Sequence, residues 1–251
     1  MDRTEASRCK AKSEKWYSWS RSPSRRNTRY FVPCRTLLVT VLAAAVLAKQ
    51  GFAGARHPNG SSPSVKINVR LYNRARVPDE TLRPAEDDVS KIFLLANVAI
   101  AFVDCSPTED QVPSYPACQS APGPRDFIVN ILTSGMAKHL PASNDGFGLA
   151  VFCEPSQASC IAYVNYERAA QLASNARVHR SVVLGRVLAH ELGHLLGLAH
   201  SGSGLMRAEW NRRDFGPENL PGMVFTLWEC RRIRAEAAAR AAEPVQISVK
   251  P

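Results

Sequence analysis

The chain has 251 residues, of which 45% are hydrophobic, and its 32 Lys and Arg residues against 22 Asp and Glu residues give a net charge of +10. Residues 1–36 hold ten basic and three acidic residues, and Lys49 adds a positive charge, so the remainder carries about +2. The basicity therefore belongs to the N-terminal segment. This excludes a basic nucleic-acid-binding face on the rest of the chain, which is long enough for a sizeable core.

The N-terminal segment is typical of an export signal. An uninterrupted apolar run, LLVTVLAAAVLA at 37–48, follows the basic residues, and its 12 residues fit a signal-peptide core better than a transmembrane helix. Ala53, Gly54 and Ala55 form a small-x-small cleavage signature, so we predict a leader at residues 1–55 and a mature chain that begins at Arg56. We expect a secreted or periplasmic protein. The alternative is an uncleaved leader that anchors the chain in the membrane through residues 37–48.

The cysteines agree with export. Cys9 and Cys34 leave with the leader, and five cysteines remain in the mature chain. Sequence alone leaves their pairing open, but nearness in the chain favours two disulfides, Cys105–Cys118 and Cys153–Cys160, with Cys230 left over. Because the chain contains no C-x-x-C pair, we do not expect these cysteines to bind zinc.

Beyond the leader, hydrophobic periodicity predicts one α+β domain over residues 56–251. Alternating apolar and polar residues indicate strands, and apolar residues at spacings of three and four indicate helices. A capping box of Thr226 and Glu229 opens a C-terminal helix that ends near residue 242. The other elements, in chain order, are a strand at 65–72, a helix at 84–97, strands at 100–104 and 126–132, a hairpin of 148–153 with 160–166, and a helix at 181–196.

The helix at 181–196 leads into HELGHLLGLAH, which places His190, Glu191, His194, Gly197 and His200 at fixed spacings. Residues four apart share one face of a helix, so His190 and His194 can bind one metal ion. Glu191 projects from the same turn, near enough to take a proton from a metal-bound water. Gly197 can adopt the left-handed conformation that ends a helix, and His200 then returns as a third ligand. Three protein ligands and one open position indicate a catalytic site with one Zn²⁺ ion.

This stretch resembles the metzincin family of zinc metallopeptidases, whose signature is H-E-x-x-H-x-x-G-x-x-H followed by a methionine turn. Met206 stands where the resemblance places that turn, and it should form an apolar floor under the metal. The stretch is most similar to the matrixin branch and its small bacterial secreted relatives. The chain departs from matrixins in the short spacing from His200 to Met206, in having no cysteine-switch propeptide, and in having no tyrosine soon after Met206.

The resemblance implies a metzincin-like zincin fold, with a mixed twisted sheet of about five strands, an active-site helix and a C-terminal helix. The edge strand beside the zinc is then formed by Leu149, Ala150, Val151 and Phe152. An exposed strand edge offers unpaired backbone groups, so an extended peptide can add to it as a further strand.

We therefore predict a secreted zinc-dependent endopeptidase that acts as a monomer on peptide or protein substrates, with Glu191 as the proton acceptor. Two alternatives remain: a zinc hydrolase of a non-protein or cell-wall amide, and a catalytically degenerate metzincin-like binding module. The intact Glu191 argues against the binding module, because a site without catalysis does not need it.

A few other residues are candidates for a role near the metal. Asp104 or Asp126 is a candidate to orient a zinc-binding histidine through a hydrogen bond. The aromatic residues Trp210, Phe225 and Trp228 are expected to pack in the core around the C-terminal helix rather than to contact substrate.

Overall fold

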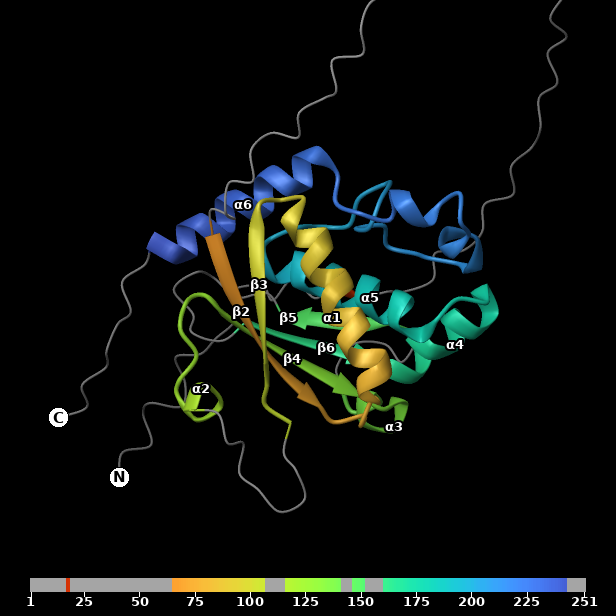
Figure 1. The fold of residues 1–251 in the computed structure, drawn as a ribbon, viewed down its shortest axis with the longest axis horizontal. Coiled ribbons are helices and arrows are strands. Elements are labelled where there is room, and N and C mark those ends of the chain that lie inside the picture. Colours follow the sequence, from red (N-terminus) through yellow and green to blue (C-terminus); the bar gives the residue numbers. More distant parts are fainter. Residues whose placement is uncertain (1–16, 19–64, 107–115, 141–145, 152–159, 243–251) are drawn as a thin grey trace, which may run out of the picture. The chain divides into compact units, whose positions relative to one another are not determined.

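A mixed β-sheet organises the computed structural model, which describes residues 17–18, 65–106, 116–140, 146–151 and 160–242 (Figure 1). The strand order is β1-β5-β6-β4-β2-β3. The pairs β3-β2, β2-β4 and β4-β6 are parallel. Strand β5 pairs antiparallel with β6 on one side and with β1 on the other. The strands are β1 Tyr17–Ser18, β2 Val65–Asn73, β3 Val98–Asp104, β4 Asp126–Leu132, β5 Gly148–Val151 and β6 Cys160–Asn165.

Helices pack against this sheet. The α-helices are α1 Asp79–Leu94, α2 Pro116–Gln119, α3 Ser134–Ala137, α4 Tyr166–Ala176, α5 Arg180–Leu195 and α6 Leu227–Ala242, and two 3₁₀ helices span Arg212–Phe215 and Leu220–Gly222. Helix α5 packs against α1 and α4 and also contacts β5 and β6, while α6 contacts β2 and β3. The predicted α+β class, with a mixed sheet, a helix that carries the H-E-x-x-H residues and a C-terminal helix, is confirmed.

Helix α5 lies within the core. Ile67, Val69 and Leu71 of β2 are fully buried, and every residue of α5 from Val183 onward is buried as well. Full burial of each large aliphatic side chain contributes about 1.5–3 kcal/mol. The polar residues on α5 therefore lie in an apolar environment, where an ionisable group without a partner is costly.

Helix α1 starts earlier than the sequence predicted. It begins at Asp79, not at Pro84, and Pro84 lies inside it. Pro78 supplies an extended N-cap, and the acidic Asp79 and Glu80 in the first turn favour the positive end of the helix dipole. Pro84 is exposed, so water can bond the backbone carbonyl that its missing N–H leaves without a helical partner.

Helix α4 was not predicted from the sequence. The predicted strand at 160–166 ends at Asn165, whose side-chain oxygen accepts a hydrogen bond from the backbone N–H of Arg168 and so caps the new helix. Its buried residues are Ala169, Leu172 and Ala173, and two of these three are too small to give a clear hydrophobic period. Asn and Ser favour caps and turns over the interior of a helix, which further weakens the pattern.

The C-terminal helix α6 begins as predicted. The backbone N–H of Thr226 donates to Glu229 Oε2 at 2.7 Å, and the N–H of Glu229 donates to Thr226 Oγ1 at 3.3 Å, which completes a capping box. Among the helices of the described residues, none is long and apolar enough to cross a membrane. The apolar run at 37–48 lies outside the described residues, as do the cleavage signature and Arg56.

Candidate metal centre

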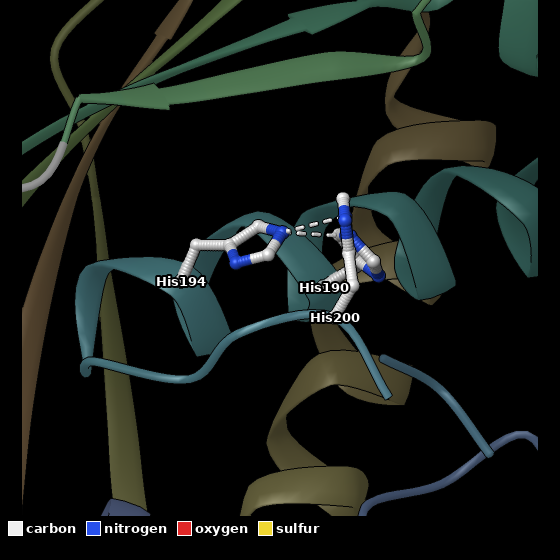
Figure 2. A group of neighbouring side chains, drawn as sticks. All are labelled: His190, His194 and His200. Carbon is white, nitrogen blue, oxygen red and sulfur yellow. Dashed lines mark hydrogen bonds between the residues drawn. The ribbon is translucent and has the colours of Figure 1, made fainter. Parts of the chain in front are cut away.

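Helix α5 presents the first two histidines of the motif. The His179 side chain caps its start by accepting a hydrogen bond from the backbone N–H of Ser181. One helical turn separates His190 from His194, and both side chains are buried, with 0% and 1% of their surface exposed. Their Nε2 atoms lie 2.9 Å apart, so the two rings aim at one point from one face of the helix (Figure 2).

Gly197 turns the chain so that a third histidine can reach the same point. Its φ of 79° is in the left-handed region, as predicted, and its N–H donates to the carbonyl of His194. His200 then returns from the following loop, half-buried, with its Nε2 atom 3.2 Å from that of His194 (Figure 2). The structure thus brings the three predicted ligands together, and one ligand atom from each lies within 4.8 Å of the others.

Burial keeps these imidazoles in the form that binds metals. It lowers the pKa of His190 well below its ordinary value, lowers the pKa of His194 to about 4, and lowers the pKa of His200 as well. The three rings are therefore neutral at neutral pH, and a neutral ring nitrogen has the lone pair that a metal ion needs.

Backbone carbonyls fix which nitrogen faces the metal point. The Nδ1 atom of His190 lies 2.9 Å from the carbonyl oxygen of Leu205, and the Nδ1 atom of His194 lies 2.8 Å from that of Leu198. A carbonyl can only accept a hydrogen bond, so each Nδ1 must carry the proton and each Nε2 keeps its lone pair. Sequence reasoning missed these partners, because any residue type can supply a backbone carbonyl.

The two aspartates proposed for this orienting role do not perform it. Asp126 accepts hydrogen bonds from Asn68 and Arg70, and the latter contact is an ion pair at 2.7 Å. Asp104 is exposed and accepts a hydrogen bond from the backbone N–H of Ser106. Both carboxylates stabilise loops next to the parallel strands, and the prediction that one of them orients a histidine is wrong.

Met206 lies against the motif helix, close to the ligands. It is fully buried, and a Cβ atom added to Gly193 would lie only 2.8 Å from its sulfur. The carbonyl oxygen of Met206 accepts a hydrogen bond from the N–H of Ser201 at 2.8 Å, which closes the loop that carries His200. Gly193 is therefore the residue that gives Met206 room on α5, a role that sequence spacing did not reveal.

Aromatic side chains surround His190. The ring of Trp210 meets the ring of His190 edge to face, with centroids 5.3 Å apart, and also stacks on Phe147 at 6.2 Å. Trp210 and Phe225 are buried as predicted, whereas Trp228 is 62% exposed, so its assignment to the core is wrong. Aromatic rings thus line one side of His190.

The predicted substrate strand is in part described. Strand β5 covers Gly148–Val151, within which Leu149 and Ala150 are buried, while Phe152 lies outside the described residues. In register, Ala150 pairs with Ala162 of β6 on one side and with Tyr17 of β1 on the other. The prediction that β5 is the edge strand is therefore wrong, because β1 pairs with its other side and is the outermost strand of the sheet.

The cysteines are joined in part as expected. A disulfide links Cys105 to Cys118 across a sequence separation of 13. Cys160 is also disulfide-bonded, but Cys153 lies outside the described residues, so the pairing Cys153–Cys160 stays a prediction. Cys230 is a buried free thiol.

Comparison with known proteins gives distant structural likenesses. No protein-family model matches this chain, and no curated protein matches it. Among solved structures, it is similar to the crystal structure of archaemetzincin from Methanopyrus kandleri, with 18% sequence identity, a TM-score of 0.42, and coverage of 74% of this chain and 99% of that chain. The case for a function therefore rests on the residues of the site itself.

Proposed function

We propose that this chain is a zinc-dependent endopeptidase that is exported from the cell. The observation that carries the proposal is the convergence of three neutral imidazoles, His190, His194 and His200, on one point, with the buried Glu191 directly after His190 in the chain. Three protein ligands leave one coordination position open, which is the arrangement of catalytic rather than structural zinc sites.

The donor set fits zinc. Ligands at about 2.0–2.1 Å from a tetrahedral ion lie roughly 3.3 Å from one another. The Nε2 atom of His194 is 2.9 Å from that of His190 and 3.2 Å from that of His200, so small ring movements suffice to admit an ion. The carbonyls of Leu198 and Leu205 already hold two of the rings in the required tautomer.

The chemistry is divided between the ion and the chain. When bound, Zn²⁺ supplies a Lewis acid that polarises a carbonyl and lowers the pKa of a water molecule towards about 7. Glu191 acts as the general base that takes the proton from the attacking water, and it then delivers this proton to the leaving amine. The carbonyls of Leu205 and Leu198 orient His190 and His194 so that each Nε2 atom faces the point where the ion would lie.

The strand β5 suits an extended peptide as substrate. Its backbone pairs antiparallel with Tyr17–Ser18, which belong to the predicted leader, so a peptide substrate would take the place of this segment and form the same kind of ladder hydrogen bonds. A peptide in that place would bind through its main chain, with alternate side chains left to set the specificity. This favours a peptide bond over a compact non-protein amide as the scissile group.

Export is proposed from the leader and the cysteines. The apolar run at 37–48 and the signature Ala53-Gly54-Ala55 have the form of a secretory signal. The Cys105–Cys118 disulfide supports an oxidising compartment, because such bonds are rare in the reducing cytosol. Intact-mass measurement of protein recovered from its host tests this: a mature chain should begin near Arg56 with its disulfides formed, and a chain that keeps the leader with free thiols would contradict it.

Peptide cleavage tests the activity. The protein should cleave members of a broad peptide library, lose this activity with a chelator and regain it with zinc. Glu191→Gln keeps the size of the side chain but removes the base, so kcat should fall by roughly 10²–10⁴-fold with zinc content unchanged. The exposed Glu80→Gln, on α1, is the matched control and should behave like wild type. Zinc binding without cleavage of any peptide would favour a catalytically degenerate binding module. Cleavage of a cell-wall amide but of no peptide would favour a zinc hydrolase of non-protein amides.

A further inference from the structure

Gly148, the first residue of β5, lies directly against the side chain of Glu191. A Cβ atom built on Gly148 would lie closest to Glu191 Oε1, and only 2.6 Å from its Cδ and 2.7 Å from its Cγ. All three distances are far below those of ordinary van der Waals contact between carbon atoms, about 3.5–4.0 Å. Three consecutive atoms of the Glu191 side chain therefore occupy the space that any other residue at position 148 would fill.

The glycine is not explained by backbone conformation. The glycines of the described residues with positive φ are Gly197 and Gly204, and Gly148 is not among them. Within a strand, glycine is otherwise unfavourable, because it loses more conformational entropy than other residues and has no side chain to pack. The space taken by Glu191 is thus the feature that accounts for a glycine here.

The backbone is held on both sides of this contact. The strand at Gly148 is held by its pairing with Val164 and by the hydrogen bond from the N–H of Asn165 to the carbonyl of Phe147, at 2.8 Å. Glu191 belongs to α5, whose residues on both sides are buried. A side chain at position 148 would therefore be accommodated by rotation of the Glu191 side chain, which carries its carboxylate away from its present place.

We propose that Gly148 is a positioning residue for Glu191: by having no side chain, it lets the carboxylate lie against the start of β5. The proposal rests on the proposed function in that Glu191 is taken as the general base. It also links the substrate strand to the catalytic machinery, because the residue that receives the carboxylate is the first residue of that strand.

Kinetics of Gly148→Ala give the first test. We expect kcat to fall by roughly 10²-fold or more, with KM changed much less and zinc content unchanged, because the base is displaced and the ligands are not. Gly222→Ala is the matched control, since a Cβ there would meet no atom within 4 Å, and it should keep wild-type kinetics. A Gly148→Ala variant with wild-type kcat would overturn the proposal.

A double-mutant cycle on the unfolding of the full-length, zinc-free protein gives the second test. Gly148→Ala should lower the melting temperature by roughly 3–10 °C, the range expected for overpacking in a domain of this size. In a Glu191→Ala background the same substitution enters vacated space, so it should leave the melting temperature unchanged or raise it. An equal loss in both backgrounds would show that the added methyl group meets something other than Glu191, and would overturn the proposal.

The two tests separate this proposal from the one it rests on. The unfolding cycle needs neither zinc nor substrate, so it fails only if Gly148 does not receive the Glu191 side chain. A wild-type protein that binds zinc and cleaves no peptide counts instead against the endopeptidase function.

Discussion

The ion pair between Asp88 of α1 and Arg186 of α5 joins the motif helix to its neighbour. The loss of unfolding free energy on removing this pair can be worked out from its burial. Arg186 Nη1 lies 2.7 Å from Asp88 Oδ2, and the two side chains are only 10% and 27% exposed. Gly185 makes this approach possible, because a Cβ there would lie 2.8 Å from the same carboxylate oxygen. Asp88→Ala would leave the Arg186 guanidinium buried without this partner.

The expected cost follows from that burial. Removing one partner of a fully buried pair costs about 3–5 kcal/mol, and the partial exposure of Asp88 reduces this to roughly 2–3 kcal/mol. At roughly 2–4 °C per kcal/mol for a domain of this size, the melting temperature should fall by about 4–12 °C. Burial raises the pKa of Asp88 despite the nearby Arg186, so desolvation outweighs the attraction of the pair. Replacing both residues, as Asp88→Ala with Arg186→Met, should therefore recover most of the lost stability.

Urea and thermal unfolding of the zinc-free protein measure these effects. Asp87→Ala is the matched control, because Asp87 is the exposed neighbour on the same helix, and it should change stability by less than about 0.5 kcal/mol. Equal losses in the Asp87 and Asp88 variants would refute the reasoning, and so would a double variant as unstable as Asp88→Ala alone.

Three further predictions concern pH, the helix-ending turn and the disulfide. Burial, with the nearby Asp104, Asp79 and Asp87 adding to it against Arg83, raises the pKa of Glu86 to about 7. The folded state thus binds this proton more tightly than the unfolded state, and wild type should lose stability as the pH rises from the ordinary glutamate value through 7. Glu86→Gln should then stabilise the protein at pH 8 and not at pH 5; an equal effect at both would contradict the assignment. Gly197→Ala imposes a side chain on a left-handed residue, so it should cost about 1–2 kcal/mol and weaken zinc binding in titration, whereas unaltered affinity would show that His200 does not depend on this turn. Reduction of Cys105–Cys118 should cost about 3 kcal/mol in urea unfolding, the value for a closed loop of this length, and no loss would mean that the unfolded chain is not constrained by it.

The site was more predictable from sequence than its surroundings. The ligand set His190, His194 and His200 follows from helical geometry and one glycine, both of which are local in the chain. The carbonyl partners at Leu198 and Leu205 have no residue signature. These contacts depend on how the segment after α5 folds back onto the histidines.

Long-range contacts also limit how much of the fold can be predicted from the sequence. The strands at 65–73 and 126–132 have strong apolar patterns, and their predicted bounds differ from the structure by one residue at most. The small buried residues of α4 give only a weak pattern, so that helix went unnoticed. The contact of Gly148 with Glu191 joins residues more than forty positions apart, and no periodicity in either segment indicates it.

X-ray absorption at the zinc edge tests the central claim most directly. On the full-length protein with one equivalent of zinc, the three-histidine site predicts three imidazole nitrogens at about 2.0–2.1 Å, an oxygen donor and no sulfur. His200→Ala should reduce the imidazole count to two, while His139→Ala, which alters an exposed histidine, should leave the spectrum unchanged. A sulfur donor at about 2.3 Å, or an unaltered spectrum in His200→Ala, would contradict the account.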